Sequence, residues 1–140
     1  MKTLVAVVAL AFGFPGCETR PPVVKHDGGP LVVYEHGGGI AAQPRRLVIE
    51  RDGRAKLTVV TGADESHRAF RLTGPELDDV ERALEDAAGA EQPKPTGCAD
   101  CFTFSITADG IDVDLDQVSI DDAPEPVGRL VTLLEGLSSP

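Results

Sequence analysis

Large aromatic side chains and positive charge are both scarce in this chain of 140 residues. It holds no tryptophan, one tyrosine and five phenylalanines, and its 23 aspartates and glutamates outnumber its 13 lysines and arginines, for a formal net charge of −10. A core must therefore be built mainly from aliphatic side chains, and no platform for stacking a cofactor is evident. Nucleic-acid binding needs a concentrated positive surface. We therefore expect no nucleic-acid partner and no cofactor.

The chain also lacks an apolar run long enough to cross a membrane. Its longest run covers 4–14 and follows Lys2 closely. On a helix it would span about 16 Å, against about 30 Å for a hydrocarbon core. A short run that begins near a positive charge and ends at small residues is typical of a secretory signal. We assign 1–16 to a signal peptide.

The apolar run ends in Gly16-Cys17, which resembles the lipobox of bacterial lipoproteins, although Phe14 and Pro15 differ from its usual residues. In those proteins the cysteine receives a diacylglycerol and becomes the mature N-terminus. The resemblance implies lipidation of Cys17, export and anchoring to a bacterial membrane. Cleavage elsewhere, such as after Ala11, and an uncleaved N-terminus are the alternatives.

The amino-acid composition of the residues after the predicted signal peptide divides them into a tether and a domain. Residues 17–30 comprise the cysteine and a stretch rich in proline, glycine and charge, which predicts a flexible tether. Its thirteen residues after Cys17 reach about 40 Å when extended, enough to hold a domain clear of the head groups. The remainder, 31–140, is sufficient for one domain but not for two.

Strand patterns dominate the predicted domain. Asp52-Gly53 and Asp109-Gly110 each separate two strand-like runs, a strong hairpin signal. Phe102, Phe104 and Ile106 alternate with polar residues, which predicts one buried face. The segment 61–68 is expected to be a loop. We predict strands over 31–35, 45–51, 54–60, 69–72, 102–108 and 111–118.

Two helices complete the predicted fold. Thr73 and Glu76 have the spacing of a capping box before an apolar stripe in 77–90, with Gly89 as the stop. Residues 121–126 read as the capped start of a second helix, whose stripe is Val127, Leu130, Leu134 and Leu137. We therefore predict an α+β fold, in which an antiparallel sheet of about four to six strands is packed by two helices on one face.

Cys98 and Cys101 have a spacing found in redox motifs, zinc sites and small disulfide loops. Reactive pairs usually sit at a helix N-terminus, whereas this pair precedes a strand. A zinc site would need two of His26, His36 and His67, which have no ordered spacing. In an exported protein the pair favours a structural disulfide, worth about 2 kcal/mol for so small a loop.

Patterns for catalysis are missing from the sequence. Ser66-His67 lies outside any G-x-S-x-G elbow, and the glycines at 37–39 precede a strand rather than a phosphate-binding helix. Asp112, Asp114 and Asp116 alternate along one strand and could bind a cation such as Ca²⁺, but a solvated strand face is favoured. We expect neither enzymatic activity nor a metal site.

The segment Gly38-Gly39-Ile40-Ala41-Ala42-Gln43-Pro44-Arg45 resembles the N-terminal motif of the emfourin family, small inhibitors of protealysin, a thermolysin-like zinc metalloprotease. The resemblance extends over 31–137. Its later parts are the helix at 77–90, Asp100 before Phe102-Thr103-Phe104, the Asp109-Gly110 hairpin and the leucine-rich terminal helix. Ala42, Gln43, the cysteine pair and the lipoprotein start depart from that family.

This resemblance implies a domain without chemistry of its own that blocks the substrate cleft of a thermolysin-like zinc metalloprotease. It assigns contact to Gly38, Gly39, Ile40, Ala41, Pro44 and Arg45. Glycines let a backbone approach a partner closely, and Ile40 could enter an apolar subsite; alternatively, the glycines serve only a turn. A lipoprotein of the same fold with an unrelated envelope role is the second hypothesis.

Replacing the predicted lipidated residue tests the anchor. Cys17→Ser removes the thiol that would carry the lipid, so the exported protein should move from the membrane fraction to the soluble fraction on cell fractionation. Cys98→Ser, which leaves Cys17 intact, is the matched control and should stay with the membranes. Unchanged partitioning of Cys17→Ser would contradict lipidation at this residue.

Overall fold

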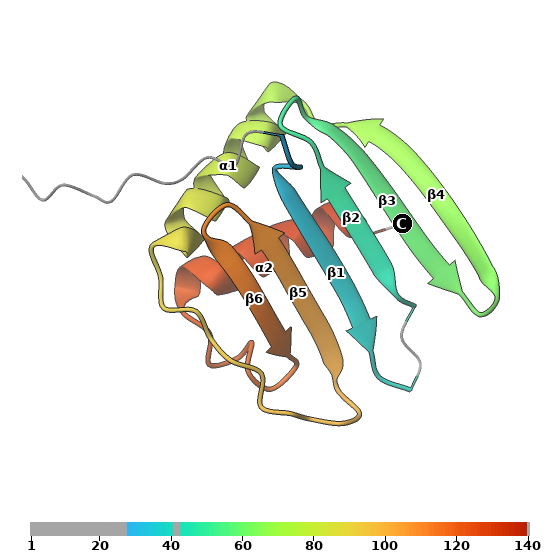
Figure 1. Cartoon of the computed structure of the whole chain (residues 1–140), viewed down its shortest axis with the longest axis vertical. Helices are drawn as coiled ribbons and strands as arrows, with labels where there is room; N and C mark the ends of the chain where they lie inside the picture. Colours follow the sequence, from blue (N-terminus) through green and yellow to red (C-terminus); the bar gives the residue numbers. More distant parts are fainter. Residues whose placement is uncertain (1–27, 41–42, 140) are drawn as a thin grey trace, which may run out of the picture.

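The structure is a computed structural model that describes residues 28–40 and 43–139. Within these residues, six strands form one open antiparallel sheet and two helices cover one of its faces (Figure 1). The α+β fold predicted from the sequence is confirmed. The predicted signal peptide, Cys17 and nearly all of the tether lie outside the described residues.

The sheet has the strand order β4-β3-β2-β1-β5-β6, with β1 joining two hairpin groups at its centre. All five neighbouring pairs are antiparallel. The elements are β1 (Val32–Gly38), β2 (Arg45–Ile49), β3 (Arg54–Thr61), β4 (Asp64–Arg71), α1 (Gly74–Ala88), β5 (Phe102–Ala108), β6 (Ile111–Asp116) and α2 (Glu125–Ser138).

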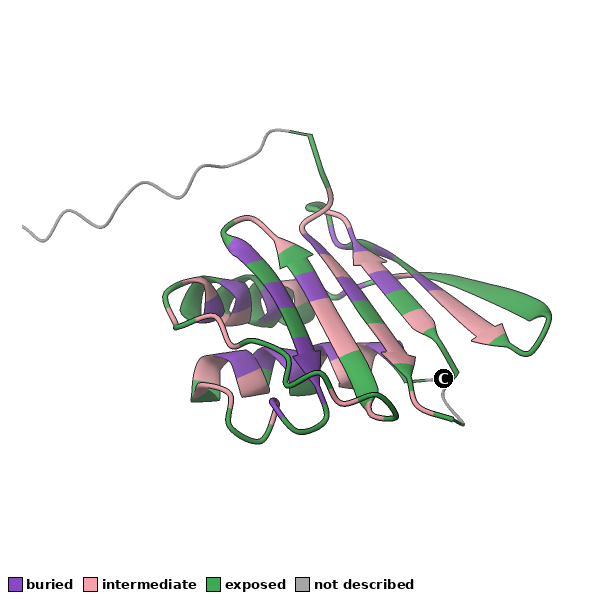
Figure 2. Cartoon of the chain, turned by 60° about the horizontal axis from the view of Figure 1, so that its bottom comes forward, coloured by how far each residue is buried: buried purple, intermediate pink, exposed green. Residues whose placement is uncertain are grey.

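The expected loop at 61–68 is wrong. Residues 61–64 form the turn of a hairpin, in which Thr61 pairs with Asp64 and β4 continues from there along β3. Only Phe70 of β4 is even half-buried, and the outer part of the hairpin is exposed (Figure 2). A strand without a buried side lacks the alternation that reveals strands in a sequence, and backbone pairing with β3 determines it instead.

The core lies between the sheet and the two helices. Tyr34 at the centre of β1 pairs with Leu47 on β2 and with Ile106 on β5, and all three are fully buried. The helices cover this row with the predicted stripes, of which Val80, Leu84, Ala87, Val127, Leu130 and Leu134 are buried. Each large aliphatic side chain contributes about 1.5–3 kcal/mol on burial, so this face determines the register of the sheet.

The two helices begin differently. Thr73 caps α1 as predicted, because its hydroxyl accepts from the Glu76 amide while the Glu76 carboxylate accepts from the Thr73 amide at 2.7 Å. A capped start for α2 is wrong: Pro124 is its N-cap, and no side chain among the described residues caps it. Within the same residues, no helix is long and apolar enough to cross a membrane.

Polar side chains cross the opposite, uncovered face of the sheet. Strand pairing places Arg46 beside Glu35 and Glu35 beside Ser105. Arg46 Nε and Glu35 Oε1 are 2.8 Å apart, but both side chains are more than half exposed, so this ion pair contributes little to stability. This face is the solvated side of the sheet.

Candidate protein-binding site at one end of the sheet

The β1–β2 loop and the segment before β5 meet at one end of the sheet. There Gly38 pairs with Phe102, and the Gln117 amide donates to the Phe102 carbonyl at 2.9 Å. The final rung of the sheet on this side therefore joins Gly38, Phe102 and Gln117, and regular strand pairing ends there. We call this end the tip and define it as residues 38–40, 96–102 and 116–119.

Gly38 is required by close packing inside the tip. Its φ is +73°, and a Cβ at this position would lie 2.5 Å from the Cys101 carbonyl oxygen and 3.2 Å from the Thr103 nitrogen. Backbone atoms cannot yield as a flexible side chain can, so only glycine fits here. A Cβ on Gly39 would likewise lie 3.2 Å from the Phe102 ring. Both glycines therefore let the β1–β2 loop pack directly on the segment before β5.

Three large apolar side chains are exposed in the described part of the chain, and all three lie in the tip. Ile40 is 94% exposed, Val118 is 49% exposed and Phe102 is 38% exposed. Single exposed hydrophobic residues are ordinary on protein surfaces, whereas a group of them marks a candidate interaction site. Their position next to the final rung makes the tip the best candidate for protein binding.

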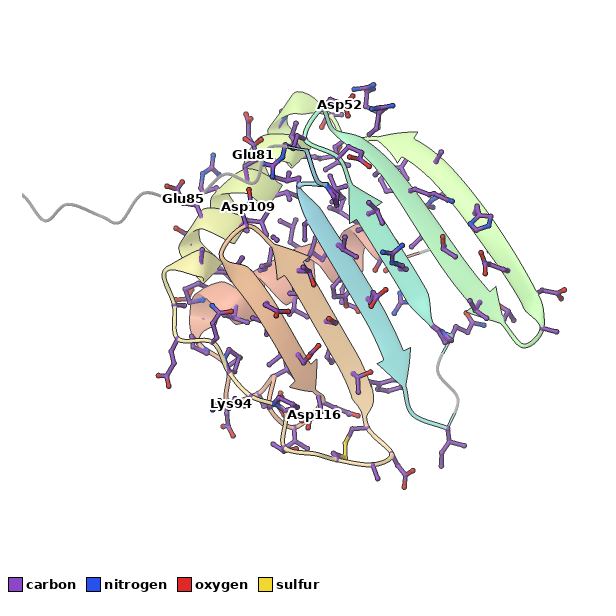
Figure 3. All side chains as sticks on the ribbon, in the orientation of Figure 1. Asp52, Glu81, Glu85, Lys94, Asp109 and Asp116 are labelled. Atoms are coloured by element: carbon purple, nitrogen blue, oxygen red, sulfur yellow. A yellow bond between two sulfur atoms is a disulfide. The ribbon has the colours of Figure 1, made fainter. Side chains whose placement is uncertain are left out.

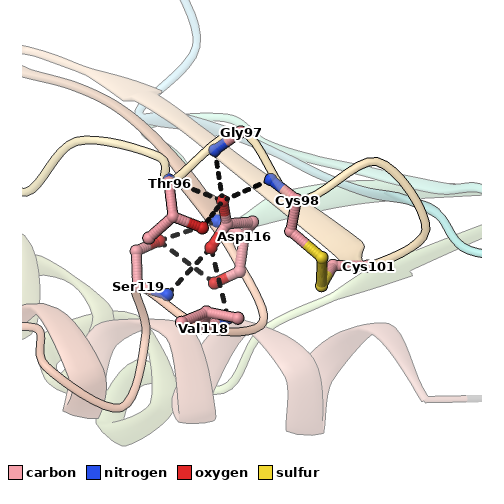
Figure 4. The surroundings of a disulfide bond; sticks show 7 residues. All are labelled: Thr96, Gly97, Cys98, Cys101, Asp116, Val118 and Ser119. Atoms are coloured by element: carbon pink, nitrogen blue, oxygen red, sulfur yellow. Dashed lines mark hydrogen bonds between the residues drawn. A yellow bond between two sulfur atoms is a disulfide. The ribbon is translucent and has the colours of Figure 1, made fainter.

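A disulfide closes the segment that leads into β5. Cys98 and Cys101 are bonded, with their Cα atoms 5.5 Å apart (Figure 4). The predicted pairing is thus seen in the structure. Because the Cys101 carbonyl lies against Gly38, the disulfide also restricts the segment on which the start of the β1–β2 loop packs.

Asp116 accepts hydrogen bonds from both sides of the tip. Its Oδ2 accepts from the Thr96 amide at 2.6 Å, the Thr96 hydroxyl at 2.7 Å and the Gly97 amide at 3.0 Å. Its Oδ1 accepts from the Ser119 amide at 2.8 Å and the Val118 amide at 3.2 Å. One carboxylate therefore joins the segment before the disulfide to the turn after β6 (Figure 4).

The expected solvated aspartate face is correct for Asp112 and Asp114, which are exposed, but wrong for Asp116, which is 2% exposed. The segment around Thr96 lies over the end of β6 and excludes water from this carboxylate. Hydrogen bonds, above all from the Thr96 hydroxyl, hold the pKa of Asp116 far below its usual value near 3.8, against the opposing effect of desolvation. The buried group is thus a carboxylate stabilised by N–H and O–H donors.

A second polar cluster supports the tip from the helix side. The Tyr34 hydroxyl donates to Glu135 Oε1, and Arg45 Nη2 donates to Glu135 Oε2 at 3.3 Å. His36 Nδ1 lies 2.5 Å from Arg45 Nη2 and 2.8 Å from Glu135 Oε1, so it can accept from the first or donate to the second. Glu135 therefore ties the last turns of α2 to β1 and β2.

Burial decides the protonation of this cluster. It raises the pKa of Tyr34, and the hydrogen bond to Glu135 adds to that rise. It lowers the pKa of His36 despite the attraction of Glu135. Both side chains are therefore neutral at pH 7.

The His36 ring connects this polar cluster to the tip by packing against two phenylalanine rings. It packs edge-on against Phe102 with the ring centroids 5.4 Å apart, and tilted against Phe104 at 4.9 Å. His36 Nε2 is buried and has no hydrogen-bond partner among the described residues. The contact of His36 with the tip is thus a packing contact.

The residues predicted to contact a protease are distributed over two environments. Gly38, Gly39 and Ile40 lie in the tip, and Pro44 is exposed at the start of β2. The Arg45 side chain is only 16% exposed because its guanidinium binds Glu135. Ala41 lies outside the described residues.

Phe102, Val118 and Asp116 were not predicted as site residues. The alternation along β5 placed Phe102 on the buried face, but at the strand end the helices no longer cover that face fully. No sequence signal points to Val118, and Asp116 was considered only for cation binding, an interpretation that was not favoured. Only the final rung of the sheet, which pairs residues distant in sequence, brings them together.

Among the described residues, no three histidine, cysteine, aspartate or glutamate side chains come together as metal ligands would. Neither a scan against protein-family models nor a search of curated proteins returns a match to this chain. The resemblance to the emfourin family therefore stays a prediction from the sequence.

Asp116→Asn tests the role of the buried carboxylate. The amide is a weaker acceptor, and its NH₂ group would face N–H donors, so we expect thermal unfolding near pH 7 to shift down by about 5 °C. The exposed residue two positions earlier supplies the control, Asp114→Asn, which should not change the melting temperature.

The pH dependence follows from the lowered pKa of Asp116. Stabilisation by the charged carboxylate is complete above the unfolded-state value near 3.8 and is lost as pH falls toward the folded-state pKa. The gap in melting temperature between the native chain and Asp116→Asn should therefore narrow below about pH 4. A gap that is absent at pH 7, or that widens in acid, would show that the carboxylate does not hold the tip together.

Proposed function

We propose that this protein is a membrane-anchored inhibitor that binds a thermolysin-like zinc metalloprotease through its tip and excludes substrate from the cleft. The observation that carries this proposal is Ile40, whose side chain is 94% exposed directly after two closely packed glycines, Gly38 and Gly39. The resemblance to the emfourin family supports the class of target. Inhibition of this kind needs no catalytic group in the inhibitor.

Preorganisation explains how such a loop would bind. Its first residues are held by pairing of Gly38 with Phe102 and by the close approach of Gly38 to Cys101. A segment that is already held in place, as Gly38 and Gly39 are, loses less conformational entropy when it binds. Transfer of the Ile40 side chain from water into an apolar subsite is worth about 1.5–3 kcal/mol, which makes it the main anchor.

The position of the tip suits an anchored inhibitor. Val32 begins β1 next to the predicted tether, whereas Gly38 ends β1 at the tip. Seven residues of strand span about 23 Å. If a lipid anchors the chain through the tether, the tip therefore lies on the side of the domain away from the membrane. The tip would then be available to proteases in the surrounding compartment.

Ile40→Asp tests this function in the full chain, purified in mild detergent and titrated against thermolysin with a peptide substrate. We expect stoichiometric inhibition by the native protein and at least about 30-fold weaker inhibition by Ile40→Asp, because a charge cannot enter an apolar subsite without a large cost. Circular dichroism should be unchanged. Ala69→Asp introduces the same charge at an exposed position on β4 and should inhibit like the native protein.

Two results would count against this account. Native protein that leaves several thermolysin-like enzymes unaffected would exclude inhibition and favour the hypothesis of a lipoprotein with another binding or structural role. Inhibition by Ile40→Asp at native potency would remove the β1–β2 loop from the binding site.

A further inference from the structure

Phe102 is fixed beside the loop that carries Ile40. Its ring lies close enough to Gly39 that a Cβ there would approach to 3.2 Å, and the His36 ring packs on it from within. The ring is nonetheless 38% exposed. An aromatic side chain that is held on two sides and open on a third loses little freedom on binding, as is typical of interface anchors.

Val118 lies on the other side of Phe102. The hydrogen bond from the Gln117 amide to the Phe102 carbonyl joins the two segments, and Asp116 accepts from the Val118 amide. Ile40 and Val118 thus come shortly after the ends of β1 and β6, and Phe102 begins β5, which lies between these two strands in the sheet. Neighbouring strands are about 4.8 Å apart, so these three strand ends lie side by side at one end of the sheet.

The opposite end of the domain has different chemistry. Asp52 and Asp109 lie there, far from Asp116 (Figure 3). Both are paired, Asp109 with Arg51 at 2.7 Å and Asp52 with Arg54 at 2.8 Å. Ionic pairs thus occupy one end of the sheet and exposed apolar side chains the other, which distinguishes the tip from the general surface.

We propose that Phe102 and Val118 contact the same partner as Ile40, so that the tip occupies an extended apolar cleft rather than a single subsite. This inference rests on the proposed function and adds two specificity-determining residues to it. Three exposed apolar side chains at the ends of adjacent strands can fill more than one subsite. The partner that fits this surface is a protease whose cleft accepts apolar side chains at neighbouring subsites.

The test compares Phe102→Ala and Val118→Ser with Phe70→Ala in the full chain, titrated against thermolysin. Phe70 is partly buried on β4 beneath Arg68, so Phe70→Ala removes the same ring away from the tip. We expect inhibition about 10-fold weaker for Phe102→Ala and about 5-fold weaker for Val118→Ser, with Phe70→Ala at native potency. Circular dichroism checks folding, and Val118→Ser decides the question if Phe102→Ala does not fold.

The outcomes separate this inference from the function on which it rests. Native-like potency of both tip variants, alongside inhibition by the native protein, would overturn the extended contact and leave inhibition through Ile40 intact. Weakening by Phe70→Ala equal to that by Phe102→Ala would also overturn it, because the effect would not be specific to the tip. A native protein that does not inhibit would overturn both proposals.

Discussion

The carboxylate of Asp116 joins two parts of the chain that the sheet alone would leave separate. It accepts from the Thr96 and Gly97 amides on one side and from the Ser119 amide on the other. The segment that it holds continues through the disulfide to Phe102, whose pairing with Gly38 places the β1–β2 loop. A buried charge is tolerated here because its donors replace water, and the arrangement of the tip depends on it.

Glu135 has the corresponding role on the helix side of the sheet. It accepts from Tyr34 and Arg45, and its neighbour His36 packs against Phe102. Buried polar groups that are fully paired favour one conformation over others even when their net contribution to stability is small. Asp116 is such a group, and the partly buried Glu135 adds a second set of polar contacts near the same end of the sheet. Together they explain how a tip without a hydrophobic core of its own keeps a defined shape. A defined shape at the tip would suit the inhibition that we propose.

The parts of the fold predicted from the sequence are those determined by local patterns. The Asp109-Gly110 hairpin, the Thr73–Glu76 capping box and the apolar stripes of both helices act within a few residues and were found correctly. Residues 64–68 of β4 were expected to be loop because none of their side chains is buried, whereas the strand predicted at 69–72 overlaps the end of β4. Asp116 was misplaced because its burial comes from Thr96, which is distant in sequence. The tip combines three segments, and the resemblance to the emfourin family pointed only to the one that contains Ile40.

We propose that the tip is the surface that meets the protease. Hydrogen–deuterium exchange of the full chain, measured with and without an excess of thermolysin that has been inactivated without altering its cleft, tests this most directly. The account predicts that protection on binding is concentrated in peptides covering 38–40, 100–103 and 117–119. Protection confined to β4 or to the polar face of the sheet, with the tip unchanged, would contradict it.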